Sequence, residues 1–176
     1  DNSNQGGTVR VTGDVTYDLA NSSSPIDNRA SGGEIIIESD ATLSIDDSGD
    51  NPQSGSQFAL NNNGGGGVTG DGTLEFVGDD DGNTNVDLLV ANTPGGADQI
   101  LPSVTTTDVR VQLGENNINA VEIGGDLTVD KTSASGFAVR LGAGNTGPIT
   151  VTGNVEANGR VDFGATGDVG AITING

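Results

Sequence analysis

The densest group of potential metal ligands in the sequence is the acidic segment 79–87. It carries carboxylate or amide side chains at Asp79, Asp81, Asn83 and Asp87, with a glycine between the second and third of these. Calcium-binding loops place oxygen ligands at alternating positions, and a glycine permits the sharp bend. The EF-hand pattern does not fit, because no glutamate follows at its spacing. Calcium at these four residues is therefore a hypothesis, and a solvated acidic turn is the alternative; no cofactor is required.

Missing residue types exclude much catalytic chemistry. The 176 residues contain no His, Cys, Met or Trp and only one Tyr. An imidazole base, a thiolate nucleophile, a disulfide and a Cys/His zinc site are therefore impossible. Acidic side chains remain, but Lys131 is the only lysine, and aromatic residues that could stack on sugars are few. We therefore expect a non-enzymatic protein and keep a carbohydrate-binding or carbohydrate-cleaving module as an alternative.

The charge balance also restricts the partners. Twenty-five acidic residues against six basic ones give a formal net charge of −19. Such a charge argues against binding to nucleic acid and to anionic membrane surfaces. No apolar run reaches the length of about 18 residues that a membrane span needs, so we expect no membrane-spanning segment.

The elements that must position these side chains are short β-strands. Apolar residues recur two positions apart, as in Leu43 and Ile45 or Val139 and Leu141. This is the period of a half-buried strand. Gly, Asn and Asp, which favour turns, separate the groups. Because no window shows a helical apolar stripe, we expect an all-β chain of about 14–16 short strands rather than a disordered one.

A repeat decides between all-β architectures. Similar tripeptides begin at Leu127, Ile149 and Ile172. Successive tripeptides are spaced by about 22–23 residues, and Leu141 and Phe163 have the same spacing. The segment 7–15 also matches 147–155, at a distance that about six such coils would span. A fixed period of this length is typical of a solenoid.

We therefore predict a parallel β-solenoid of about seven coils, each of about 22–23 residues. Residues 1–176 form one domain or a segment of a longer repetitive protein, with loop insertions near 48–67 and 78–101. An antiparallel β-sandwich of the pilin type is the alternative, although it gives no reason for the repeat. The predicted core comprises Val9, Val11, Ile35, Ile37, Leu74, Phe76, Leu127, Val129, Val139, Leu141, Ile149, Val151, Phe163 and Ile172.

Several repeats resemble those of filamentous-haemagglutinin-like surface proteins. The resemblance is carried by the segments 124–129, 147–155 and 170–176, and by 32–37 together with 41–45. It implies a right-handed parallel β-helix that is secreted and serves adhesion or forms extracellular fibres. On this basis we expect an extracellular or cell-surface location, with cell-surface glycans as candidate partners. The resemblance supplies no receptor-binding residues.

The two ends of the predicted solenoid are candidate assembly edges. The strand with Val9 and Val11 and the strand with Ile172 and Ile174 show no recognisable cap, and the latter is uncharged with high β-propensity. Exposed edges of this kind pair with other strands. We therefore expect a homopolymer, a filament or sheath whose copies join head to tail; a fragment of a large secreted β-helix adhesin is the alternative. Asn21 begins an Asn-Ser-Ser triplet and is a candidate glycosylation site.

Overall fold

The computed structural model describes residues 7–18, 34–46, 57–60, 67–78, 87–90, 98–115, 119–131, 136–144, 146–164 and 169–176, with the backbone alone for 57–60, 87–90 and single residues elsewhere. These residues form eighteen strands. The strands are β1 (Thr8–Val11), β2 (Val15–Asp18), β3 (Glu34–Ile37), β4 (Thr42–Asp46), β5 (Gln57–Leu60), β6 (Val68–Gly70), β7 (Thr73–Val77), β8 (Asp87–Val90), β9 (Gln99–Leu101), β10 (Ser103–Thr107), β11 (Arg110–Glu115), β12 (Val121–Ile123), β13 (Leu127–Asp130), β14 (Phe137–Ala143), β15 (Ile149–Val151), β16 (Val155–Asn158), β17 (Arg160–Phe163) and β18 (Ile172–Ile174).

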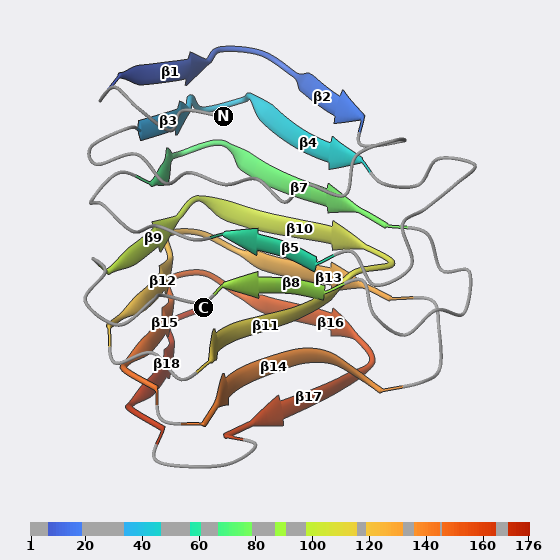
Figure 1. Ribbon diagram of the computed structural model, residues 1–176, viewed down its shortest axis with the longest axis vertical. Helices are drawn as coiled ribbons and strands as arrows, with labels where there is room; N and C mark the ends of the chain where they lie inside the picture. Colours follow the sequence, from blue (N-terminus) through green and yellow to red (C-terminus); the bar gives the residue numbers. More distant parts are fainter. Residues whose placement is uncertain are drawn as a thin grey trace.

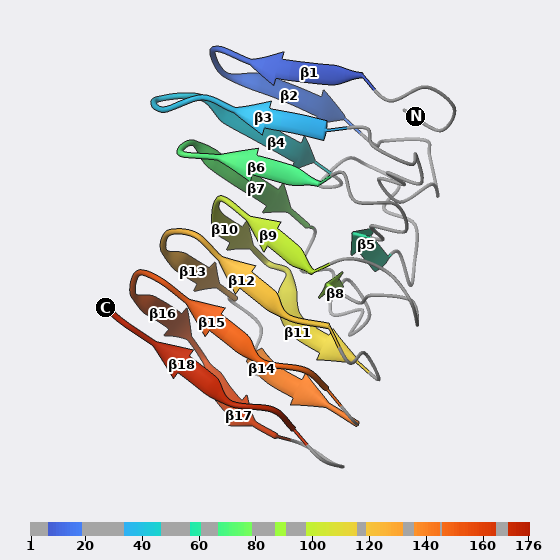
Figure 2. The same cartoon turned by 90° about the vertical axis from the view of Figure 1, so that its left-hand side faces the viewer.

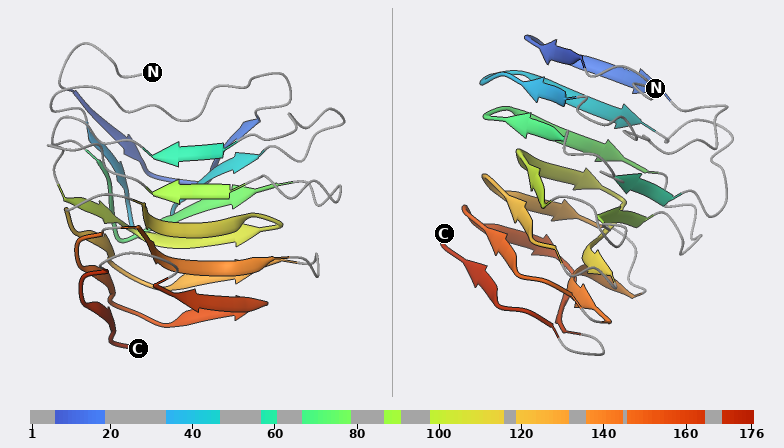
Figure 3. Two further views of the ribbon diagram at one scale, coloured as in Figure 1. Left: turned by 60° about the horizontal axis from the view of Figure 1, so that its bottom comes forward. Right: turned by 60° about the vertical axis from the view of Figure 1, so that its left-hand side comes forward.

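The strands stack as the coils of a parallel β-solenoid (Figure 1). Sheet A has the order β1-β3-β6, sheet B β16-β13-β10-β7-β4-β2, sheet C β17-β14-β11-β8-β5 and sheet D β18-β15-β12-β9. Sheets A and D follow one another on one face, where β6 contacts β9 (Figure 2). Sheets B and C form the other two faces, and the chain visits the three faces in turn (Figure 3).

The predicted fold class is confirmed. Every strand pair among the described residues is parallel, which excludes the antiparallel sandwich. The face formed by sheets A and D holds seven described strands, in agreement with about seven coils. The described part of the chain contains no helix with the length and apolarity needed to cross a membrane.

The predicted coil length was only partly right. Ile149 pairs with Ile172, and Leu141 with Phe163, as the predicted offset required. Leu127, however, pairs with Val104 and Val155 in sheet B, so it does not stack on Ile149 in sheet D. The two tripeptides have the same alternation but lie on different faces.

Longer coils also occur between the short ones. Asp126 and Asn154, which form a hydrogen bond between successive corners, are 28 residues apart. The matching segments 7–15 and 147–155 contain β1 and β15, which are separated by five coils rather than six. The average coil over that stretch is therefore longer than predicted, because the connections between faces vary in length.

The core lies between the three faces and is filled by the inward side of each strand. Leu74, Phe76, Leu113, Leu127 and Leu141 are among its fully buried members. The polar member Thr106 is also fully buried, and its hydroxyl donates to the carbonyl of Val109 at 3.1 Å. Most predicted core residues are confirmed: Val11, Ile37, Leu74, Phe76, Leu127, Val129, Val139, Leu141, Ile149 and Val151 are buried, and Ile35 and Ile172 pack against the core.

Two core predictions were wrong. Val9 is 50% exposed and Phe163 is 59% exposed. Both point inward in their ladders, opposite Ile35 and Leu141 respectively. They lie on β1 and β17, which are the outermost strands of sheets A and C, so no described strand covers them from the far side.

Hydrogen bonds between successive coils stabilise the corner that leads into sheet B. The Asp126 carboxylate accepts the backbone N–H of Asn154 at 2.8 Å, and Asp14 accepts that of Thr42 at 3.1 Å. The N–H of Gly153 donates to the carbonyl of Gly125 at 2.9 Å. Successive corners therefore stack directly on one another, which explains the abundance of Gly and of short polar residues between the strands.

The segments expected to be loop insertions contain regular strands. β5 lies within 48–67, and β8 and β9 lie within 78–101; all three take places in sheets C and D. The remainder of the first segment, apart from residue 67, lies outside the described residues, as does most of the remainder of the second.

Candidate functional site

The proposed calcium ligands fall mainly outside the described residues. Asp79, Asp81 and Asn83 are not described, and Asp87, the first residue of β8, is described by its backbone alone. Within the described residues, no group of three or more acidic side chains is placed to hold a metal ion. Calcium binding by the segment 79–87 stays a prediction. The glycosylation candidate Asn21 also lies outside the described residues.

The predicted N-terminal assembly edge is the first coil of the described stack, and several of its apolar side chains are exposed. β1 and β2 are the outermost strands of sheets A and B. Val11 is buried, but Val9 and Val15 are half-exposed and Tyr17 is 56% exposed. In the ladder of sheet B, Tyr17 lies beside Ile45, which is buried. Tyr17 is therefore exposed because its strand is the outermost of the described strands of sheet B. Its neighbour Ile45 has the same inward orientation one coil further along and is buried.

The predicted C-terminal assembly edge has the same character. β18, β16 and β17 are the outermost strands of sheets D, B and C at this end. Ile174 is 39% exposed, whereas its ladder partner Val151 is buried. Ile172 is partly buried, and Phe163 adds a largely exposed aromatic ring. At each end of the described stack, apolar side chains on the outermost strands thus stay exposed although they point inward, toward the side on which their ladder partners pack. We call these side chains inward-type.

Sequence reasoning found part of this surface. Val9, Val11, Ile172 and Ile174 were predicted as assembly edges, whereas Phe163 was predicted only as a core residue. Val15 and Tyr17, whose alternation matched that of the strand 42–46, were not predicted. All the exposed ones lie on outermost strands, which the sequence alone does not identify.

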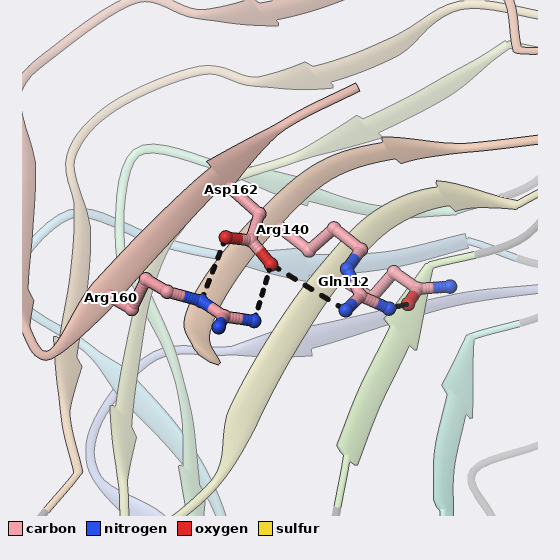
Figure 4. A network of polar contacts seen from close by, with 4 residues as sticks. All are labelled: Gln112, Arg140, Arg160 and Asp162. Carbon is pink, nitrogen blue, oxygen red and sulfur yellow. Dashed lines mark hydrogen bonds and ion pairs between the residues drawn. The ribbon is translucent and has the colours of Figure 1, made fainter. Parts of the chain in front are cut away.

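A second cluster of functional interest lies on the outer surface of sheet C (Figure 4). The Arg140 guanidinium donates to the Gln112 side-chain oxygen at 3.3 Å and lies 3.5 Å from a carboxylate oxygen of Asp162. Arg160 approaches both oxygens of Asp162 at 2.9 Å. The four residues come from the three neighbouring strands β11, β14 and β17.

An aromatic ring supports this cluster. Phe137 of β14 is buried, and the guanidinium carbons of Arg140 and Arg110 lie 3.9 Å and 5.1 Å from its ring centroid. Cation–π contacts of this kind are favourable and hold the arginine side chains against the sheet. The cluster was not predicted from the sequence, because its residues come from different coils; Gln112 and Arg140, for example, are 28 residues apart.

Comparison with family models, with curated proteins and with solved structures finds no match to this chain. The class of protein is therefore defined by the fold alone, as an acidic parallel β-solenoid whose outermost described coils carry exposed apolar side chains.

Proposed function

We propose that the chain is a non-enzymatic structural protein of an extracellular filament or sheath, in which copies join head to tail through their terminal coils. The observation that carries the proposal is the pair of apolar ends. Val9, Val15 and Tyr17 at one end, and Phe163 and Ile174 at the other, are inward-type side chains that stay exposed. The proposed extracellular location rests on the resemblance of the repeats to those of secreted surface proteins.

The contact proposed between copies continues the existing ladder. β1 of one copy would pair in parallel with β18 of the next, so that Val9 lies beside Ile172 and Val11 beside Ile174. These residues already follow the alternation of their own ladders, in which Val9 pairs with Ile35 and Ile172 with Ile149. Strand addition satisfies unpaired backbone N–H and C=O groups. Because the contact uses two different surfaces, it does not close, and repetition produces a fibre.

Unequal sheets favour a second candidate function. The described strands number seven on the face of sheets A and D, six in sheet B and five in sheet C. If β1 of a copy pairs with β18, β2 of that copy lies two coil levels from β16, because no strand of sheet B fills the level of β18. A fragment of a larger β-helix adhesin, in which further coils of the same chain cover β16 and β17, would avoid this gap.

An end-blocking variant tests the head-to-tail contact. Ile174→Glu places a charge on the inward side of β18, where it would have to be buried between copies. Thr173→Glu is the matched control, because it adds the same charge to the same strand on the exposed outer side. We expect fibres of the unaltered chain and of Thr173→Glu in electron micrographs, and monomers of Ile174→Glu in analytical ultracentrifugation.

Two results would reject the polymer. One is an unaltered chain that stays monomeric at millimolar concentration, which would favour the adhesin fragment. The other is equal assembly of Ile174→Glu and Thr173→Glu. Circular dichroism of both variants checks that neither substitution has unfolded the chain.

A further inference from the structure

One corner of the solenoid has a glycine at the same place in five of the described coils. Each of these glycines lies two residues after the end of a strand of sheet A or D: Gly13, Gly72, Gly125, Gly153 and Gly176. The corners stack along one edge of the molecule (Figure 2). The other two coils have Ser39 and Ser103 at this place, so the corner as such does not require glycine.

In four of the five coils, contact with the preceding coil explains the glycine. A Cβ atom at Gly72 would lie 2.6 Å from the carbonyl oxygen of Ala41, and one at Gly176 would lie 2.5 Å from the backbone nitrogen of Asn154. At the two glycines between them, a Cβ would overlap a side-chain oxygen of the coil before. Real Cβ atoms do not approach other atoms so closely, so no side chain fits against the preceding corner in these coils.

Gly13 is the exception among the five. A Cβ atom there would meet nothing within 4 Å among the described residues. Its φ is not positive, so the backbone conformation does not require glycine either. Gly13 belongs to the first described coil, in which Val9 and Tyr17 are also half-exposed. Gly13 therefore has the form of a corner that fits against a preceding one, although no described corner lies on that side.

We infer that Gly13 receives the corner 175–176 of a second copy, and that the absence of a side chain at this position admits the next molecule. The inference rests on the proposed head-to-tail contact. Continuing the register of that contact two residues beyond β1 and β18 brings Gly176 of one copy beside Gly13 of the next. The N–H of Gly13 would then donate to the carbonyl of Gly176, as the N–H of Gly176 donates to the carbonyl of Gly153 at 3.2 Å. The glycine corner would thus set the register between copies.

A larger side chain at position 13 should block growth without weakening the molecule itself. We expect Gly13→Leu to raise the critical concentration for fibre formation by about tenfold or more, because it overpacks the contact between copies. The unfolding midpoint of the single molecule in urea should stay that of the unaltered chain, since the new side chain enters open space. Thr16→Leu is the matched control, because it enlarges an exposed residue of the same coil on the outer side of β2. It should leave the critical concentration unchanged.

A mixture of two blocked variants distinguishes a blocked contact from a damaged fold. Gly13→Leu keeps the last coil unaltered, and Ile174→Glu keeps the first coil unaltered. Each variant alone should sediment as a monomer, whereas an equimolar mixture should form a dimer that grows no further. Sedimentation velocity measures all three samples.

The results separate this inference from the proposed function. Fibres of Gly13→Leu at the critical concentration of the unaltered chain would overturn the role of Gly13 and leave head-to-tail assembly standing. A mixture that stays monomeric would also overturn that role, because the substitution would then act beyond its own contact. An unaltered chain that stays monomeric would overturn both proposals and would favour a preceding coil of a longer chain as the occupant.

Discussion

At the scale of single residues, the stacked corners leave no room for a side chain at Gly153. A Cβ atom at Gly153 would lie 2.1 Å from the Asp126 carboxylate and 2.9 Å from the Gly125 carbonyl oxygen. Gly13 takes the equivalent place in the first coil, but a Cβ there meets nothing within 4 Å. We expect Gly153→Ala to lower the free energy of unfolding by about 1–3 kcal/mol and Gly13→Ala to change it by about 0.5 kcal/mol or less. Urea denaturation measures both; equal losses would show that the corners do not stack directly.

At the scale of elements, β13 tests the assignment of inner and outer faces. Leu127 is fully buried, whereas the neighbouring Thr128 lies on the outer side. Leu127→Ala should cost about 2–5 kcal/mol of unfolding free energy, because it leaves a cavity in a packed core. Thr128→Ala should cost about 0.5 kcal/mol or less. Thermal unfolding followed by circular dichroism compares the two; a greater loss for Thr128→Ala would contradict the register of sheet B.

The same strand shows how far sequence alone could go. Alternation identified strands such as 127–129 and 149–151, and the repeat identified parallel stacking. It could not assign those strands to different faces, because Leu-Thr-Val and Ile-Thr-Val present the same local pattern. Shorter and longer coils both occur, since corner connections can lengthen without disturbing the ladders. The face assignment is also what brings Gln112, Arg140 and Asp162 together on sheet C, so this cluster could not be predicted.

At the scale of the whole molecule, the ends and the sides of the solenoid are surfaces of different chemical character. The ends of the solenoid carry apolar side chains and strand edges, which would be covered by further coils. The sides carry outward polar and charged side chains, such as the ion pair of Arg140 and Asp162 on sheet C. Growth along the solenoid axis would therefore be driven by burial of apolar surface at the ends.

Disulfide trapping between copies tests the central claim, that β1 of one copy pairs with β18 of the next. The chain contains no cysteine, so an Arg10→Cys/Thr173→Cys variant has no background thiol. In the proposed register these outer positions lie side by side on parallel strands about 4.8 Å apart, within the Cα separation that a disulfide spans. The control variant Thr128→Cys/Thr173→Cys places one thiol on an internal strand of sheet B. Mild oxidation followed by non-reducing electrophoresis should give a ladder of covalent multimers for Arg10→Cys/Thr173→Cys alone, whereas multimers no more abundant than in the control would contradict head-to-tail assembly.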